Sequence, residues 1–256
     1  YALSGYSYRS VGPAFMSGRI ADIAIDSNNE NVWYVAVGSG GVWKTKNAGT
    51  TWMPLTDNMP FYSTGSVTID PNDSSRIWVG TGENVAGRHV GIGHGIYLSK
   101  DSGSTWDNMG LKKSEHISKI IVHPDNSDII WVASQGPLWN SGGDRGLFMS
   151  NDGGNTWSNK LYVNEWTGVT DIIIDPTNPD ILYAATWQRH RNVASLIDGG
   201  PGTSIYKSTD GGNVWVEIDS GLPSSNMGKI GLAISPIKPE VIYAAIEFCL
   251  LYTSPS

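Results

Sequence analysis

The sequence predicts an all-β protein of the β-propeller class, with four complete four-stranded blades and the inner half of a fifth. One eight-residue pattern recurs in residues 45–52, 99–106, 150–157 and 208–215. Pairs of short apolar strands recur with it, and four antiparallel strands in a unit of roughly 40–60 residues are typical of a propeller blade. A β-sandwich is the main alternative, but it does not explain a hairpin that repeats at near-constant spacing. Four and a half blades are expected to leave the ring open.

The repeated pattern reads Ser/Thr-x-Asp/Asn-x-Gly-x-Thr/Val-Trp and predicts a clamped hairpin turn. Its Ser and Asp side chains can hydrogen-bond nearby backbone amides. Its Gly stands where the turn requires a positive φ, and its Trp begins the returning strand with the largest apolar side chain. We therefore assign a structural role to Asn47, Gly49, Trp52, Ser99, Asp101, Gly103, Trp106, Ser150, Asp152, Gly154, Trp157, Ser208, Asp210, Gly212 and Trp215.

Each repeat begins with two inner strands, named A and B here, and ends with strands C and D on either side of the hairpin turn. The A strands are predicted at residues 20–26, 65–70, 117–123, 169–175 and 229–235, and the B strands at 32–37, 77–81, 129–134, 181–186 and 241–246. These are nearly continuous runs of Ile, Val, Ala, Trp and Tyr, as expected of strands covered on both faces. Proline pre-sets a turn φ and stops a strand, so the A–B turns are marked by Pro71, Pro124, Pro176 and Pro236.

The blades are accordingly expected at about residues 15–60, 61–112, 113–165, 166–224 and 225–247. The last residues break the pattern, because the next hairpin should follow there and does not. Residues 249–256 begin with the only cysteine, Cys249, and resemble a translated sequencing adapter. Residues 248–256 are therefore interpreted as a non-native tail, and the chain as a fragment.

Composition argues against several classes of function. The 256 residues carry a formal net charge of −7 and no basic stripe, which disfavours nucleic acid as a partner. No apolar run is long enough to span a membrane. The histidine spacing matches no compact ligand motif, so no metal or other cofactor is expected.

The alternation of strand directions predicts which face carries function. Successive strands run in opposite directions, so the A–B turns and the C–D hairpins must share one face of the propeller. The B–C loops and the crossovers between blades must share the other. The B–C loops vary in length and are long at residues 82–94, 136–145 and 187–203. Variable loops on a repeated scaffold usually carry binding.

The candidate ligand-binding residues are seven polar or aromatic residues of that face: Arg19, Glu83, Arg88, His94, His116, Trp187 and Arg189. The arginines would bind anionic or carbonyl groups, and Trp187 would stack on a sugar or a peptide side chain. Glu83 and the two histidines would provide directional hydrogen bonds.

Each of these residues also has a structural interpretation. Glu83 can be held by backbone amides or by an arginine, and so fix its loop. Arg189 and its neighbours can pair with Asp198 or Glu165 across the same face. The histidines are more often hydrogen-bonding groups than metal ligands.

The octapeptide resembles the Asp box of bacterial-neuraminidase-type repeats. Further segments resemble a family of large bacterial exported propeller proteins, labelled sortilin N-terminal-domain-like or glycosyl hydrolases with neuraminidase-type (BNR) repeats. They are residues 8–13 (Tyr-Arg-Ser-Val-Gly-Pro), 17–20, 37–45, 80–83 and 199–202. The resemblance covers residues 1–247. It implies a longer, exported parent, whose remaining chain is the expected partner of this fragment.

Two enzyme groups with related propellers can be compared residue by residue. Xyloglucanase-type glycosidases are similar in the first blade, where a catalytic Asp is expected, but Gly38 stands at that place. Hydrolysis needs two carboxylates, so one of the pair is missing. Sialidases are expected to begin with Arg-Ile-Pro, but Ala21 follows Arg19-Ile20. The photosystem assembly factors with the same repeat are non-enzymatic binders.

The sequence therefore favours an extracytoplasmic binding module (periplasmic, cell-surface or secreted) for a peptide or a glycan. The alternative is a glycoside hydrolase with Glu83 as general acid and a second carboxylate such as Glu115, Glu165 or Asp198. A purely architectural repeat is the third possibility. A carboxylate pair about 5–10 Å apart across an open cleft would favour hydrolysis. An arginine holding Glu83 would favour binding or structure.

Overall fold

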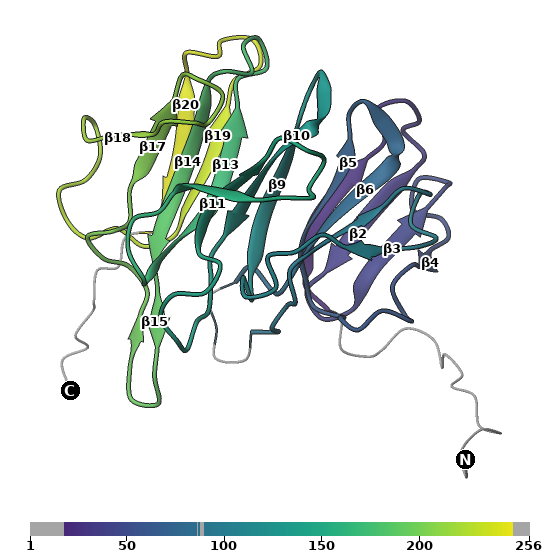
Figure 1. Ribbon diagram of the computed structural model, residues 1–256, viewed down its shortest axis with the longest axis horizontal. Coiled ribbons are helices and arrows are strands. Elements are labelled where there is room, and N and C mark those ends of the chain that lie inside the picture. Colours follow the sequence, from purple (N-terminus) through teal and green to yellow (C-terminus); the bar gives the residue numbers. More distant parts are fainter. Residues whose placement is uncertain (1–17, 86, 88–89, 248–256) are drawn as a thin grey trace.

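The computed structural model describes residues 18–247 except 86, 88 and 89, and within them it is an all-β propeller fragment. Four four-stranded antiparallel sheets and a two-stranded sheet stand side by side around an arc, from the first blade to the fifth (Figure 1). The predicted fold class is confirmed. The predicted tail and residues 1–17 lie outside the described residues.

Each of the first four sheets is a simple meander with strand A at the axis and strand D at the rim. The first blade comprises β1 (Ile20–Ile25), β2 (Trp33–Val37), β3 (Gly41–Thr45) and β4 (Met53–Pro54). The second comprises β5 (Thr64–Asp70), β6 (Asp73–Thr81), β7 (Ile96–Ser99) and β8 (Asp107–Asn108). The third comprises β9 (Ile117–His123), β10 (Asn126–Ser134), β11 (Gly146–Ser150) and β12 (Ser158–Leu161).

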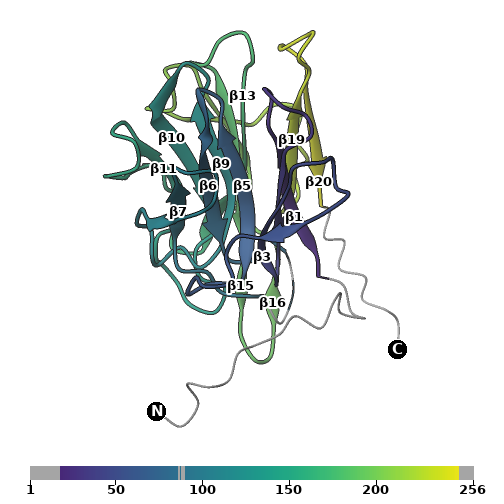
Figure 2. The ribbon, with the colours of Figure 1, turned by 90° about the vertical axis from the view of Figure 1, so that its right-hand side faces the viewer.

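The fourth blade comprises β13 (Thr167–Ile174), β14 (Leu182–Gln188), β17 (Ile205–Ser208) and β18 (Val216–Ile218). Its B–C loop contains an additional hairpin, β15 (His190–Arg191) with β16 (Leu196–Ile197), which the sequence did not predict. The fifth sheet is β19 (Ile230–Ile234) with β20 (Ile242–Ile246). Figure 2 shows β1, β19 and β20 on one side of the molecule and β7, β10 and β11 on the other.

The cores lie between blades, and one aromatic position organises them. The B strands of the first four blades carry an aromatic residue at an equivalent register position: Tyr34, Trp78, Trp131 and Tyr183. All four side chains are buried against the next blade. The Asp-box glycine of the following blade covers two of these rings: a Cβ on Gly154 would lie 2.6 Å from Trp78, and one on Gly212 would lie 2.5 Å from Trp131. Tyr243 holds the same register position in the fifth blade and is exposed. Packing between blades thus pairs a large aromatic ring with a glycine, whose lack of a side chain lets the ring approach.

The Asp boxes are closed by their own side chains. In the third box Ser150 Oγ donates to Asp152 Oδ1 at 2.7 Å and accepts from the Gly154 amide at 2.9 Å. The amide and hydroxyl of Thr156 donate to the two Asp152 oxygens at 2.9 and 2.6 Å. Gly154 has a φ of +87°, a conformation that costs glycine little. The aspartate therefore acts as the acceptor that closes the turn.

These hydrogen bonds make the box a source of acid sensitivity. They lower the pKa of Asp152 from 3.8 to about 2, the Thr156 hydroxyl contributing most. A carboxyl whose pKa is depressed on folding stabilises the fold above its unfolded pKa, and this contribution is lost as pH falls toward the folded pKa. We expect Asp152→Asn to be less stable than wild type at neutral pH, with the difference vanishing by about pH 2. Urea unfolding followed by tryptophan fluorescence across this range is the measurement; a pH-independent difference would contradict the assignment.

Hydrogen bonds fix which loops share a face. The box amides of Ser102, Gly153 and Gly211 donate to carbonyls of their own A–B turns, at Ser75, Asp128 and Asp180, over 2.8–3.0 Å. The B–C loops are tied instead to the crossovers, as Gly93 N is to Glu115 O at 2.8 Å. Boxes and A–B turns therefore lie on one face, and long loops and crossovers on the other. No helix of the described residues has the length and apolarity needed to cross a membrane.

Candidate functional site

The face of B–C loops and crossovers holds the candidate residues, and the β15–β16 hairpin projects from it at the lower edge of Figure 1. Crossover carbonyls hold the loops at their bases: Tyr62 O accepts from Gly41 N at 2.7 Å, and Trp166 O accepts from Arg189 N at 3.1 Å. Loop side chains are therefore positioned by the neighbouring blade as well as by their own strands.

Glu83 is a buried carboxylate with both oxygens engaged. Arg19 Nη2 donates to Oε1, and Ser39 Oγ lies 3.1 Å from the same oxygen. The Gly91 amide donates to Oε2 at 2.7 Å. Only 2% of the Glu83 side chain is exposed, whereas 58% of the Arg19 side chain is. This arrangement matches the structural interpretation of Glu83. An arginine, a serine hydroxyl and one backbone amide hold the carboxylate and fix the second B–C loop to the first blade.

Gly38 lies directly against this carboxylate. A Cβ at position 38 would come 2.7 Å from Glu83 Oε1, so the glycine leaves the space that the glutamate fills. The second blade thus delivers a carboxylate to the place where the first blade has no side chain.

The two candidate histidines lie in different surroundings. His94 is exposed at the rim of the second loop. His116 is buried, and burial, followed by the nearby Arg189 cation, lowers its pKa to about 3. Its imidazole is therefore neutral at physiological pH. In the described part of the chain, no group of three or more His, Cys, Asp or Glu residues could hold a metal ion.

Trp187 and Arg189 belong to a buried network that joins four blades. The Arg189 guanidinium lies 4.8 Å above the Trp187 ring and donates to Gln135 Oε1 at 2.5 Å. Gln135 Nε2 donates to Asn84 Oδ1, which also accepts from Lys229 Nζ at 2.9 Å. Burial lowers the pKa of Arg189 to about 10 and that of Lys229 to about 8.

This burial corrects the stacking role predicted for Trp187. Its ring is 1% exposed and packs beneath two cations, so no face is open to a ligand. Arg189 is likewise buried and not presented to solvent. The seventh candidate, Arg88, lies with His89 outside the described residues.

Arg145 clamps the third B–C loop and was not one of the seven candidate residues predicted for this face. Its buried guanidinium donates five hydrogen bonds to backbone carbonyls, those of Gln135, Pro137, Asn140, Gly142 and Trp166. These carbonyls belong to the third B–C loop and to the crossover that follows β12. Nothing in the sequence pattern distinguishes this arginine from an exposed one, because its partners are main-chain atoms.

Two of the carboxyls considered as the second catalytic acid, those of Glu115 and Asp198, have raised pKa values and therefore stay protonated to a higher pH than usual. Burial raises the pKa of Glu115, which also has a φ of +54°. Burial, with the nearby Glu247 carboxylate, raises the pKa of Asp198. Glu165 lies on the next crossover, where its carbonyl accepts from Gly142 N at 2.8 Å.

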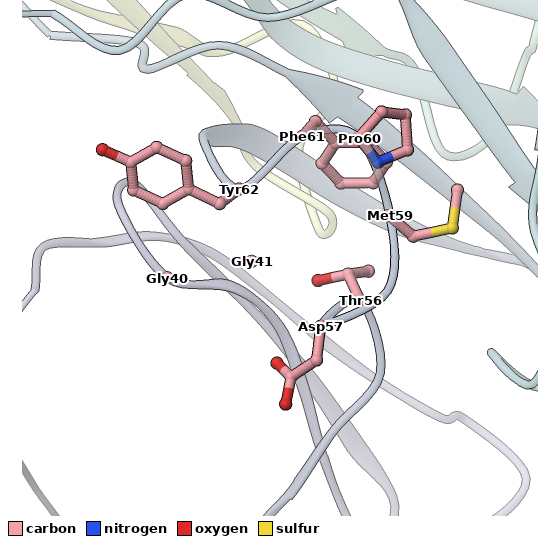
Figure 3. A pocket seen from close by; sticks show the side chains of 8 residues that line it. All are labelled: Gly40, Gly41, Thr56, Asp57, Met59, Pro60, Phe61 and Tyr62. Atoms are coloured by element: carbon pink, nitrogen blue, oxygen red, sulfur yellow. The ribbon is translucent and has the colours of Figure 1, made fainter. Parts of the chain in front are cut away.

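Among the described residues, three large aromatic side chains are exposed on the loop-and-crossover segments: Tyr62 (64%), Trp139 (44%) and Tyr162 (57%). Trp139 belongs to the loop that Arg145 clamps, and Tyr162 to the crossover beside it. Tyr62 edges a cavity of about 400 Å³ (Figure 3). Its other lining includes Gly40 and Gly41, the Thr56 and Asp57 side chains, and apolar Met59 and Phe61. An aromatic ring beside a carboxylate and bare backbone suits a ligand with apolar faces and hydroxyl edges.

Comparison with known proteins gives one family and one group of relatives. The family model of Sortilin-Vps10 (sortilin, neurotensin receptor 3) matches residues 94–229. An oligoxyloglucan-reducing end-specific xyloglucanase of Emericella nidulans is 25% identical over 77% of this chain and 24% of its own. A xyloglucanase of a Paenibacillus species is 26% identical over 83% of this chain and 22% of its own. The chain thus spans about a quarter of the length of these curated relatives.

Solved structures show the same fold. An ancestral GH74 enzyme superposes with a TM-score of 0.67 at 23% identity, over 90% of this chain and 27% of that one. The GH74 xyloglucanase of Xanthomonas campestris gives 0.63 at 17% identity, over 88% and 34%. Both matches cover about nine-tenths of this chain but only 27% and 34% of the matched proteins.

Proposed function

The chain belongs to the Sortilin-Vps10 family, and from that premise we propose that it is part of a carbohydrate-active propeller which holds a glucan of the xyloglucan type. The glycan would lie across the B–C loops and crossovers. The proposal places the protein outside the cytoplasm, where such a polysaccharide is found.

The observation that carries this proposal is the set of exposed aromatic rings on that face. Trp139 and Tyr162 stand on segments clamped together by Arg145, and Tyr62 stands beside the cavity of the first blade. Aromatic side chains on rigid supports provide large contact area at small entropic cost. Sugar rings present apolar faces that match such platforms.

The relatives favour the glycoside hydrolase alternative over the free-standing binding module that the sequence ranked first. These relatives are xyloglucanases, and they lend no support to a peptide ligand. Within this alternative we assign the described residues to substrate holding. A general acid must present a proton to the leaving oxygen, and Glu83 accepts hydrogen bonds at both oxygens from Arg19, Ser39 and Gly91.

We accordingly propose that the cleaving carboxylates belong to other parts of the longer protein, and that Glu83 holds the loop beside Gly38. Arg19 and His94 remain proposed contacts at the rim, while His116, Trp187 and Arg189 would support it from within. Arg88, which lies outside the described residues, remains a contact proposed from the sequence alone.

The test is a titration of xyloglucan oligosaccharides into the purified chain by calorimetry, with short peptides as the comparison. We expect Trp139→Ala to weaken glycan binding by about tenfold or more, since an anchoring aromatic commonly contributes that much. Val214→Ala removes an exposed apolar side chain from a box turn on the opposite face and is the matched control. Unchanged affinity in Trp139→Ala would count against the platform, and so would binding of peptides alone.

An assay of glycan cleavage distinguishes substrate holding from hydrolysis. The chain by itself is expected to release no reducing sugar from xyloglucan. If it does, and if Glu83→Gln abolishes the release, the catalytic role considered for Glu83 would replace the structural one.

A further inference from the structure

The axis of the propeller contains a polar cavity that the proposed glycan face does not use. It measures about 250 Å³ and is lined by A strands from the first, third, fourth and fifth blades. Its polar side chains are Asp22, Asn84, Ser118, Lys119, Thr170, Asp171 and Lys229.

A repeated β-bulge produces this lining. In β9, Ile117 pairs with Ser134 and Lys119 with Ala133, which leaves Ser118 as the extra residue. In β13, Val169 pairs with Thr186 and Asp171 with Ala185, which leaves Thr170. A bulge breaks the strict alternation of side chains, so two consecutive residues of each strand face the cavity.

The acceptors of the cavity are already occupied. Asp22 accepts from the amides of Ile23 and Val67 at 3.0 and 3.1 Å. Asp171 accepts from the amides of Ile172 and Leu232 at 2.9 and 2.8 Å. Both carboxylates thus tie one A strand to the next blade, and each of their oxygens has a donor.

The donors are not. The Thr170 hydroxyl is buried in a residue only 3% exposed and has no hydrogen-bond partner among the described residues. Lys119 Nζ likewise makes no hydrogen bond or ion pair within the described ranges, although Asp171 is near enough to feel its charge. Lys229 Nζ directs two hydrogens to Asn84, at O and Oδ1 over 2.8 and 2.9 Å, which leaves its third.

The surroundings of Lys229 point the same way. Its ammonium is desolvated and faces the Arg189 cation, and these two effects lower its pKa to about 8 against the opposing carboxylates of Asp171, Glu247 and Asp198. A bound anion would stabilise the charged form of this lysine.

We propose that the axial cavity binds a small oxyanion, a carboxylate or an inorganic phosphate, between Lys119 and Lys229, with the Thr170 hydroxyl as the third donor. The carboxylate acceptors of the cavity are already hydrogen-bonded, whereas some of its donors are not. The lining therefore favours a ligand that offers hydrogen-bond acceptors, such as an oxyanion. The site would be separate from the aromatic platform, so that a glycan and the anion bind independently.

The test uses sodium acetate, sodium glucuronate and sodium phosphate at constant ionic strength, with sodium chloride as the reference. Thermal unfolding and calorimetry of the chain are expected to give a saturable stabilisation by an oxyanion beyond that of chloride. Preference for acetate and glucuronate identifies a carboxylate site, and preference for phosphate identifies a phosphate site. We expect Lys119→Met and Lys229→Met to weaken binding tenfold or more, and Thr170→Val several-fold. Lys112→Met, an exposed lysine outside the cavity, is expected to bind as wild type does.

The pH dependence of acetate binding tests the contribution of Lys229 separately. Acetate does not titrate between about pH 6.5 and about pH 9, so its binding should weaken across this range as the lysine loses its proton, and this dependence should disappear in Lys229→Met. The proposal is overturned if all four salts stabilise equally, or if both lysine variants retain wild-type affinity. Should either lysine variant fail to fold, unchanged affinity in Thr170→Val would overturn it alone.

Discussion

Replacing Arg145 with methionine is expected to lower the free energy of unfolding by about 3–5 kcal/mol, one of the two largest effects anticipated for a single side chain of this protein. The guanidinium is 1% exposed and serves five carbonyls that have few other donors. A buried acceptor left without a donor costs about 1–3 kcal/mol, and water entering the vacated space offsets part of the sum. Methionine keeps much of the volume, so the loss measures the hydrogen bonds and not a cavity.

Equilibrium urea unfolding gives this quantity directly. Arg145→Lys should recover only part of the loss, because one ammonium cannot reach five carbonyls arranged around a planar fork. Lys112→Met removes an exposed cation elsewhere in the chain and should change stability little. The same Arg145 variant should also weaken glycan binding, since the clamp holds the loop that carries Trp139. A stability loss below about 1 kcal/mol would mean that solvent reaches these carbonyls without help.

The order of strands and turns in each blade could be predicted from the sequence because it depends on local, repeated chemistry. The predicted A strand at residues 117–123 coincides with β9, and the predicted B strand at 129–134 lies within β10. Two B strands begin earlier than predicted, β6 at Asp73 and β10 at Asn126, because strand pairing continues past the apolar run. The β15–β16 hairpin escaped notice since its residues, His190–Arg191 and Leu196–Ile197, are too short for an alternating pattern.

The site was harder to predict because it is made between blades. The sequence assigned Trp187, Arg189 and His116 to loop and crossover segments, but their burial depends on the second, third and fourth loops packing over one another. Gln135 and Asn84, which link these loops, carry no sequence signal. An arginine was one of the predicted partners of Glu83, but the sequence did not identify it as Arg19, and Gly38 leaves the space for the carboxylate.

One face of this propeller is therefore fixed by repetition and the other by individual contacts. The boxes hold each blade edge to its own A–B turn with the same few hydrogen bonds, so their residue types recur. The opposite face uses different anchors in each blade: Arg19 with Glu83, Arg145 with carbonyls, and Lys229 with Asn84. This division lets loops change without disturbing the packing of blade on blade.

The packing of blade on blade is itself tested by Gly212→Ala, for which we expect a loss of about 2–5 kcal/mol. Gly212 has a φ of +86°, and a Cβ there would lie 2.5 Å from Trp131 Nε1. Trp131 is fully buried between the third and fourth blades and has little freedom to withdraw. Strain in the backbone and overlap with the ring therefore add.

Gly221→Ala separates the two contributions. Gly221 has nearly the same φ, +83°, but its Cβ would meet no atom within 4 Å. It should lose only the backbone part, about 1–2 kcal/mol. The difference between the two variants in urea unfolding then measures what the Asp-box glycine contributes by letting the preceding blade's aromatic ring approach. Equal losses would show that the glycine is required by the turn alone, and that the rings are accommodated by some other adjustment of the blades.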